Sequence, residues 1–385
     1  MIAYNRRSLD NLAIQYEAME AFEKKMLTPE EYSRIRIAYP FHFYIPNAFI
    51  RLGIFVLTVI AAACALGLFL LMGLGSGDRS IGTMLIVLGV ISYGLLELFI
   101  HAHKVYQAGV DDALLWIASA LVVTGINFTT DHLSPPLESF IILVLAVAGT
   151  LRYADRLMAL AAYGALLSFI FYRLAEWGVV ARAILPFVVL ALSAGGYFLF
   201  TRLAAKESLR HYHPCILLLR VATLVTFYLA GNYYIIREVN ASLSGGQGPV
   251  ALGWLWWLLT AAVPVFYIVK GLQKKDPLFL WTGLGLVAAT IFTVRYYYHV
   301  LPAEWAMILG GTVLIAGAYG AIRYLKTPKY GFTAELSDDP HLLADLHVEG
   351  IILAESFTAV AAQPADPGVS FGGGTTGGGG AGGQY

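Results

Sequence analysis

The chain has 385 residues, of which 58% are hydrophobic and 13% charged, and its formal net charge is zero. Soluble domains are nearer to about 45–50% apolar and about 25% charged, so this composition excludes an ordinary soluble protein. The neutral balance argues against an electrostatic nucleic-acid binder. Both cysteines, Cys64 and Cys215, lie in apolar runs, which excludes a disulfide framework or a cysteine metal cluster.

Residues 1–46 predict a small amphipathic helical hairpin in the cytoplasm. One helical stripe carries its apolar residues at spacings of three and four, namely Leu12, Tyr16, Met19, Phe22 and Met26. A second helix is expected from Thr28, with Pro29 in its first turn and Glu31 completing a capping box. The hairpin is expected to pack on the membrane surface or against a neighbouring subunit.

Residues 47–325 predict an all-α polytopic transmembrane bundle. The first apolar run follows a charged segment, so it indicates a retained span and not a cleavable signal peptide. Ten spans of roughly the required ~20 residues are expected. They are 47–74, 81–100, 113–129, 137–151, 157–172, 183–200, 215–236, 250–269, 278–294 and 304–322. The fourth and fifth are short, which leaves open whether they fully cross.

The placement of Lys and Arg predicts the orientation. If the chain has ten spans, most of its 25 basic residues fall on the side of the membrane that holds both termini. Lys and Arg are generally in excess in cytoplasmic segments. Both termini are therefore expected in the cytoplasm, in the inner membrane of a bacterium. Pro186 and Pro264 fall inside spans, where proline is expected to kink a helix.

A faint parallel repeat is visible across six helices. The segments Asp112–Trp116 and Asp276–Trp281 each open a span, and each following span ends in an Arg–Tyr pair, Arg152–Tyr153 and Arg323–Tyr324. Parallel repeats occur in transporters, although chance similarity between apolar helices is common.

The C-terminal part divides into an acidic cytoplasmic segment, 326–363, expected to be partly helical, and a glycine-rich tail, 364–385, expected to be disordered. A glycine-rich linker behaves as a flexible coil and can present an end group to a partner. Phe371 and Tyr385 are the candidate partner-binding residues of this tail. A tail that only solubilises the protein or exposes it to degradation is the alternative.

Two histidine pairs form a candidate metal site on the cytoplasmic face. His101 and His103 follow the second span, and His211 and His213 precede the seventh. Histidine with carboxylate suits Zn or Fe. Glu97 lies one turn before His101, so both side chains can face one ligand. The alternative is that these histidines are interfacial and solvated.

Arg220 is the deepest charged residue of the predicted bundle, about a turn and a half inside the span 215–236. A charge at this depth either snorkels to the interface or pairs within the bundle. The expected partners are Glu97 and Asp112, so these three residues form a candidate ligand-binding group. Arg51 is shallower and is expected to be an anchor.

The outer face carries a second candidate ligand site. Arg237 closes the seventh span, and Arg295, His299 and Glu304 link the last two. With neighbouring tyrosines they suggest a polar vestibule for a small solute. An interfacial aromatic belt is the alternative.

Enzyme motifs are absent from the sequence: it contains no Gly-x-Ser-x-Gly elbow, P-loop, His-Glu-x-x-His or Rossmann fingerprint. No enzyme activity and no cofactor are therefore expected.

Four stretches carry a resemblance to a family. Phe43–Asn47, Asp111–Trp116, Leu229–Tyr234 and Ile322–Pro328 resemble an uncharacterised family of bacterial multi-spanning membrane proteins. The likeness covers most of residues 1–335 and implies no activity, so it transfers no site residue. The C-terminal end is similar to the glycine-rich, aromatic-terminated tails of bacterial membrane-anchored proteins that contain a TPM domain, although this chain lacks that domain.

Two functions follow as hypotheses. The first is a membrane-embedded interaction or assembly protein that recruits a protein partner through its tail. The second is a small-solute transporter or channel-like protein with the outer vestibule. Membrane lipid is an expected partner in both, nucleic acid is not, and a homo-oligomer stays open.

Overall fold

The structure of the protein is a computed structural model. It describes residues 2–72, 77–130, 132–244 and 251–297, with isolated positions between 308 and 323. The described part is all-α, and nine of its helices are long and apolar enough to cross a membrane. The predicted tenth span and both C-terminal segments lie largely or wholly outside the described residues.

The N-terminal hairpin consists of α1 (Arg6–Glu23) and α2 (Pro29–Ala38). The predicted capping box is confirmed, because the Thr28 hydroxyl accepts the Glu31 N–H while the Glu31 carboxylate accepts the Thr28 N–H. The bond from the Thr28 N–H to the Glu31 carboxylate is the main reason that the pKa of Glu31 is lowered. The helices are joined by Gln15, which donates to the Tyr39 carbonyl at 2.7 Å, and by the stacked rings of Phe22 and Tyr32.

The bundle begins at α3 (Ala48–Met72). It continues with α4 (Asp78–His103), α5 (Val110–Thr129), α6 (Pro135–Tyr153), α7 (Arg156–Ala175) and α8 (Val179–Ala204). After the 3₁₀ turn η1 (Glu207–Tyr212) come α9 (His213–Gly231), α10 (Tyr233–Ser244), α11 (Gly253–Lys274) and α12 (Pro277–Tyr297). Helices α6 and α7 correspond to the two short predicted spans, and both are long enough to cross. Pro186 and Pro264 lie inside continuous helices, α8 and α11.

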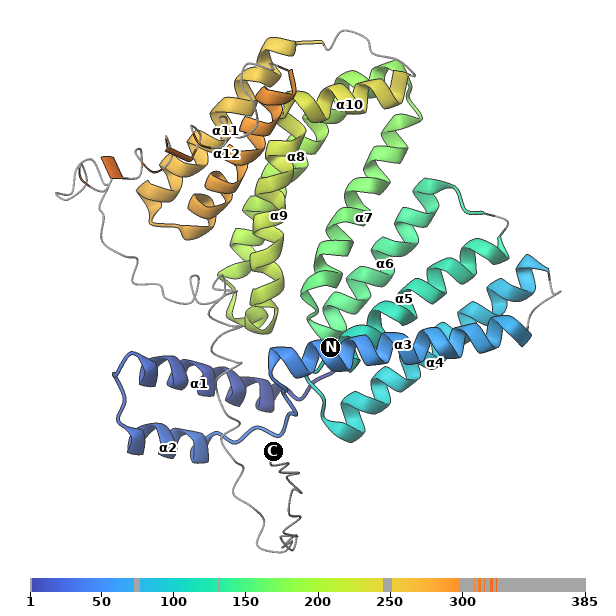
Figure 1. The fold of residues 1–385 in the computed structure, drawn as a ribbon, viewed down its shortest axis with the longest axis vertical. Coiled ribbons are helices and arrows are strands. Elements are labelled where there is room, and N and C mark those ends of the chain that lie inside the picture. The colour runs from blue at the N-terminus through green and yellow to red at the C-terminus, as the bar shows by residue number, and fades with distance from the viewer. Residues whose placement is uncertain are drawn as a thin grey trace, which may run out of the picture.

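Successive helices pack as antiparallel pairs, α4 with α5, α6 with α7, α8 with α9 and α11 with α12, and the pairs spread as a fan (Figure 1). The closest pair is α4–α5, where Gly82 and Gly125 face each other. A Cβ added at Gly125 would lie 2.7 Å from the Gly82 carbonyl oxygen. The absence of side chains here lets the two backbones meet. Helix α3 lies on the outside of α5, and none of its most apolar window is buried.

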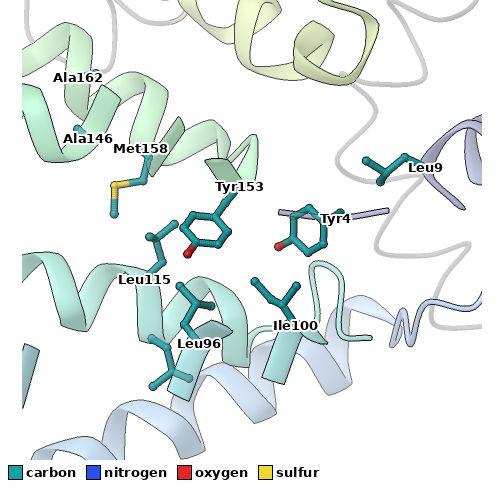
Figure 2. Close-up of a cluster of buried hydrophobic side chains, with 10 residues drawn as sticks. Tyr4, Leu9, Leu96, Ile100, Leu115, Ala146, Tyr153, Met158 and Ala162 are labelled. Carbon is teal, nitrogen blue, oxygen red and sulfur yellow. The ribbon is translucent and has the colours of Figure 1, made fainter. Parts of the chain in front are cut away.

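Two clusters of buried apolar side chains hold the bundle together. The first joins Tyr4 of the N-terminal segment to α4, α5, α6 and α7 through Leu96, Leu115, Tyr153 and Met158 in turn (Figure 2). The second joins α9, α11 and α12, and includes Leu224, Tyr228, Val263, Tyr267, Phe279 and Leu286. The N-terminal segment is thus part of the core of the first half of the bundle. The first half is α3 to α7, and the second half is α8 to α12. The end of the bundle on which α1 and α2 lie is called the hairpin side below.

The predicted span 215–236 is wrong at its far end, because the helix ends at Gly231. Asn232 has extended backbone angles, and the separate helix α10 begins at Tyr233. Asn232 favours such an end because its side-chain oxygen accepts the N–H of Tyr234 at 2.9 Å, the first turn of α10.

Candidate functional site

Asp111 is the centre of the contacts on the hairpin side. Its carboxylate is only 3% exposed and accepts the N–H groups of Gln107, Ala108 and Gly109 at 2.7–3.1 Å. The Tyr4 hydroxyl donates to it at 3.3 Å. Burial, followed by the charge of Asp111, raises the pKa of Tyr4 well above its ordinary value, so the phenol stays protonated and donates. Sequence reasoning missed this role, although an acid that follows a glycine at a helix start was a visible signal.

The N-terminal segment is held to both halves of the bundle. The Ala3 N–H donates to the Arg152 carbonyl at 2.7 Å, at the end of α6. Asp10 of α1 pairs with Arg210 at 2.6 Å and lies 3.2 Å from the His211 ring nitrogen, both in η1 just before α9. Residues 3–10 therefore connect the first half of the bundle to the second.

Arg51 is paired and not simply an anchor. Its guanidinium contacts the Asp112 carboxylate at 2.5 Å, between α3 and the first turn of α5. Gly109 makes this contact possible, since its φ is +92° and a Cβ there would collide with the Arg51 carbonyl oxygen. Only glycine combines that backbone angle with so close an approach.

Glu97 binds residues of α6. Its carboxylate accepts from Arg152 Nε and from the Tyr153 hydroxyl, each at 2.6 Å, and from Tyr93 at 3.1 Å. His101 Nδ1 lies 2.8 Å from the Glu97 carbonyl oxygen and 3.5 Å from its carboxylate. Glu97 is therefore a junction between α4 and α6.

Arg220 pairs with Asp276 at 3.4 Å, and its guanidinium lies over the Tyr197 ring at 5.7 Å. This corrects the expectation that Glu97 or Asp112 is its partner. The reason is the order of the helices: α9 packs against α12, whose N-cap region supplies Asp276, whereas Glu97 and Asp112 lie in the first half.

The two Arg–Asp pairs occupy corresponding places. In each half, an arginine of one span contacts the aspartate that opens the predicted repeat segment, Arg51 with Asp112 and Arg220 with Asp276. The preceding helix ends at an αL residue in both halves, Lys104 or Lys275, although Lys275 directly precedes Asp276 and Lys104 lies eight residues before Asp112. These contacts support the predicted parallel repeat, which stays a prediction.

The candidate metal residues do not form a ligand set. Among the described residues, no group of three or more His, Cys, Asp or Glu side chains is arranged to hold a metal ion. His103 packs on Phe99, with ring centroids 5.4 Å apart, His211 faces Asp10, and His213 begins α9.

A buried polar network lies near the opposite end of the second half. The Asn232 amide donates to the Tyr228 hydroxyl at 2.9 Å and to the Thr293 hydroxyl at 3.0 Å. The Tyr233 N–H at the helix break donates to Thr260, and the Thr290 hydroxyl donates to the Thr260 carbonyl. The network joins α9, α10, α11 and α12 where the backbone of α9 ends. Asn232 falls within the predicted span 215–236, where the sequence assigns it no role, and in the structure it is 2% exposed.

The described part of the predicted vestibule is an aromatic cluster. Tyr233 stacks on Trp257 at 4.8 Å, Tyr234 contacts Tyr296 at 4.8 Å, and Arg237 lies over the Tyr297 ring at 5.0 Å. Arg295 is partly buried in the last turn of α12. His299 and Glu304 lie outside the described residues, as do Phe371 and Tyr385 of the tail.

These contacts make the hairpin side a junction of hydrogen bonds and ion pairs, and the other end of the second half a packed polar and aromatic region. Comparisons of the chain with protein-family models, with curated proteins and with solved structures found no match. The resemblance to uncharacterised bacterial membrane proteins therefore stays an expectation.

Proposed function

We propose that this multi-pass membrane protein is an interaction or assembly protein that holds a protein partner on its hairpin side. The observation that carries the proposal is the way the α1–α2 hairpin is presented. It is fixed to the bundle through Ala3, Tyr4 and Asp10, yet no residue of α2 is buried. Ile37 of α2 is 77% exposed, and Met26 and Tyr16 are 73% and 56% exposed.

Apolar side chains of a rigid element outside the membrane-crossing helices suit recognition by another protein. Pre-ordering the hairpin lowers the entropic cost of binding, because the surface does not have to be arranged when the partner arrives. Exposed apolar groups that are rimmed by charge often mark such contact sites. The predicted apolar stripe of α1 is covered only in part, since Leu12 is buried while Tyr16 is exposed.

The acidic segment and the glycine-rich tail supply the second half of the proposal. With both termini in the cytoplasm of a bacterial inner membrane, the tail emerges on the same side as the hairpin. A flexible linker of this kind raises the local concentration of its end group near a bound partner. Phe371 and Tyr385 are the aromatic residues we propose as the contact points.

The test is crosslinking and affinity capture from native membranes with four forms of the full-length protein. These are the unchanged chain, a chain truncated after Ala362, Ile37→Glu, and Glu30→Lys as an exposed charge control on the same helix. We expect one partner to be captured by the unchanged chain and the control, and to be lost with truncation or Ile37→Glu. Equal capture by all four forms would contradict the proposal.

A small-solute transporter is the second candidate, favoured by the broken helix at Asn232. In many transporters the substrate site is built where a spanning helix is broken inside the bundle. In that case uptake of a solute into vesicles should be lost on substitution of Arg220, Arg295 or Glu304 and kept after removal of the tail. An assembly protein should show the reverse dependence.

A further inference from the structure

An apolar groove runs between α7 and α9, where the two halves of the bundle meet. Its volume is about 390 Å³, and its walls are formed by one stripe of each helix. The α7 wall consists of Leu160, Tyr163, Gly164 and Leu167, at spacings of three and four. The α9 wall includes Leu218, Ala222 and Val225. Gly164 is open to the groove side, since a Cβ added there would meet nothing within 4 Å.

The groove lies at the depth of one leaflet. At 1.5 Å per residue, Leu160 and Leu167 lie about 6 Å and about 16 Å beyond Arg156, the first residue of α7. Half of the hydrocarbon core of a bilayer is about 15 Å thick. The apolar walls therefore extend from just inside the headgroup region of the hairpin-side leaflet to about the middle of the membrane, the depth covered by one acyl chain.

Arg156 lies at the headgroup end of the same stripe. It is one turn before Leu160 on the same face of α7, and its side chain is exposed. Its guanidinium takes part in none of the ion pairs found among the described residues. A cation at the rim of an apolar groove matches the phosphate of a lipid whose chain occupies that groove.

Tyr163 adds a polar group to the wall. Its buried hydroxyl lacks a hydrogen-bond partner among the described residues. Aromatic side chains on helices lean toward the helix N-terminus, here toward Arg156. The ester oxygens of a phospholipid lie between its phosphate and its chains, so the lipid brings acceptors to this end of the groove.

We propose that the α7–α9 groove binds one anionic phospholipid of the hairpin-side leaflet, with an acyl chain between the two helices and its phosphate at Arg156. The lipid fills the groove that the two stripes of α7 and α9 form where the halves of the bundle meet. The site is independent of the proposed partner surface on α1 and α2.

The first experiment locates the chain of the lipid. The full-length protein is placed in nanodiscs that contain phosphatidylglycerol with a photoactivatable diazirine on one acyl chain, and labelled peptides are mapped by mass spectrometry. We expect the label to concentrate in residues 156–175 and 213–231. A label spread over α3 and the other lipid-facing helices in proportion to their exposed surface would overturn the proposal, because it would mean annular lipid only.

The second experiment uses matched variants and native mass spectrometry. Arg156→Gln should weaken binding of phosphatidylglycerol about five-fold and leave phosphatidylcholine unchanged, since one basic residue near a membrane surface contributes about that factor. Arg202→Gln, an exposed arginine at the hairpin-side end of α8, is the control. Gly164→Leu should remove the groove label, and Gly195→Leu, at an equally open position of α8, should keep it.

Each variant is first checked for a single peak in size-exclusion chromatography and an unchanged melting temperature, so loss of lipid is not confused with loss of fold. Retention of label and affinity in a folded Gly164→Leu protein would overturn the proposal. Crosslinks from Cys substitutions at Leu167 or Val225 to a second copy, or to residues 301–385, would also overturn it, because the groove would then hold protein.

Discussion

The Arg220–Asp276 pair gives the sharpest test of the energetic reasoning. Its side chains are 13% and 18% exposed, whereas those of the Arg51–Asp112 pair are 40% and 19% exposed. The more exposed pair is the shorter one, 2.5 Å against 3.4 Å. If distance decides, neutralising Asp112 lowers the free energy of unfolding more. If burial decides, neutralising Asp276 lowers it more. We expect burial to decide.

The substitutions are Asp276→Asn and Asp112→Asn. Asparagine at 276 keeps the side-chain oxygen that accepts the Leu278 N–H at 3.0 Å, so the start of α12 is preserved and only the charge is removed. Leaving a buried charge without its partner costs about 3–5 kcal/mol, and loss of an exposed pair costs about 0–1 kcal/mol. Arg220 Nε already lacks a hydrogen-bond partner among the described residues, which adds to its need for Asp276.

We therefore expect Asp276→Asn to lower the free energy of unfolding by about 3 kcal/mol and Asp112→Asn by about 1 kcal/mol. The assay is SDS titration in mixed micelles, followed by tryptophan fluorescence and circular dichroism. The double variant Arg220→Met/Asp276→Asn should recover most of the loss, because no uncompensated charge remains. Equal losses for the two single variants, or no recovery in the double variant, would refute the reasoning.

Three further outcomes follow from the packing. Gly125→Ala should lower the free energy of unfolding by about 1–3 kcal/mol through its clash with Gly82, while Gly94→Ala on the open side of α4 should not, as measured by the same titration. Asn232→Ala should cost about 1–3 kcal/mol and increase hydrogen exchange in residues 228–244, because it strands buried donors and acceptors; unchanged exchange would count against a structural role. Burial raises the pKa of Asp155, so the folded state binds its proton more tightly, and this stabilisation is lost as the pH rises through the folded-state pKa. Asp155→Asn should therefore gain stability relative to the unchanged protein as the pH rises above the ordinary aspartate pKa of 3.8, and a difference that stays constant with pH would contradict the shift.

The spans were predictable because a backbone surrounded by hydrocarbon can satisfy its hydrogen bonds within one segment only as an α-helix. Each backbone polar group must be satisfied within the segment, so a long apolar run has to be a helix. The start of α2 was predictable for a different reason, since the Thr28–Glu31 capping box acts within four residues. Both signals are local, and sequence carries local signals directly.

The features that the sequence did not predict depend on which helices become neighbours in the fold. Arg220 could be recognised as a charge in need of a partner, but Asp276 is identified only once α12 is known to pack beside α9. Asn232 lies in a largely apolar run, so hydropathy continued the span past the true end of the helix at Gly231. The role of Asp111 depends on Tyr4, which is more than one hundred residues away in the chain.

The contacts of residues 3–10 also set an order of assembly. These residues leave the ribosome before any of the described spans, but Ala3 needs the carbonyl of Arg152, and Asp10 needs Arg210 and His211. The N-terminal segment therefore cannot reach its final position until six spans have been synthesised and η1 has emerged. Residues 3–10 are therefore placed late, and their docking requires that the first half of the bundle has already met the second.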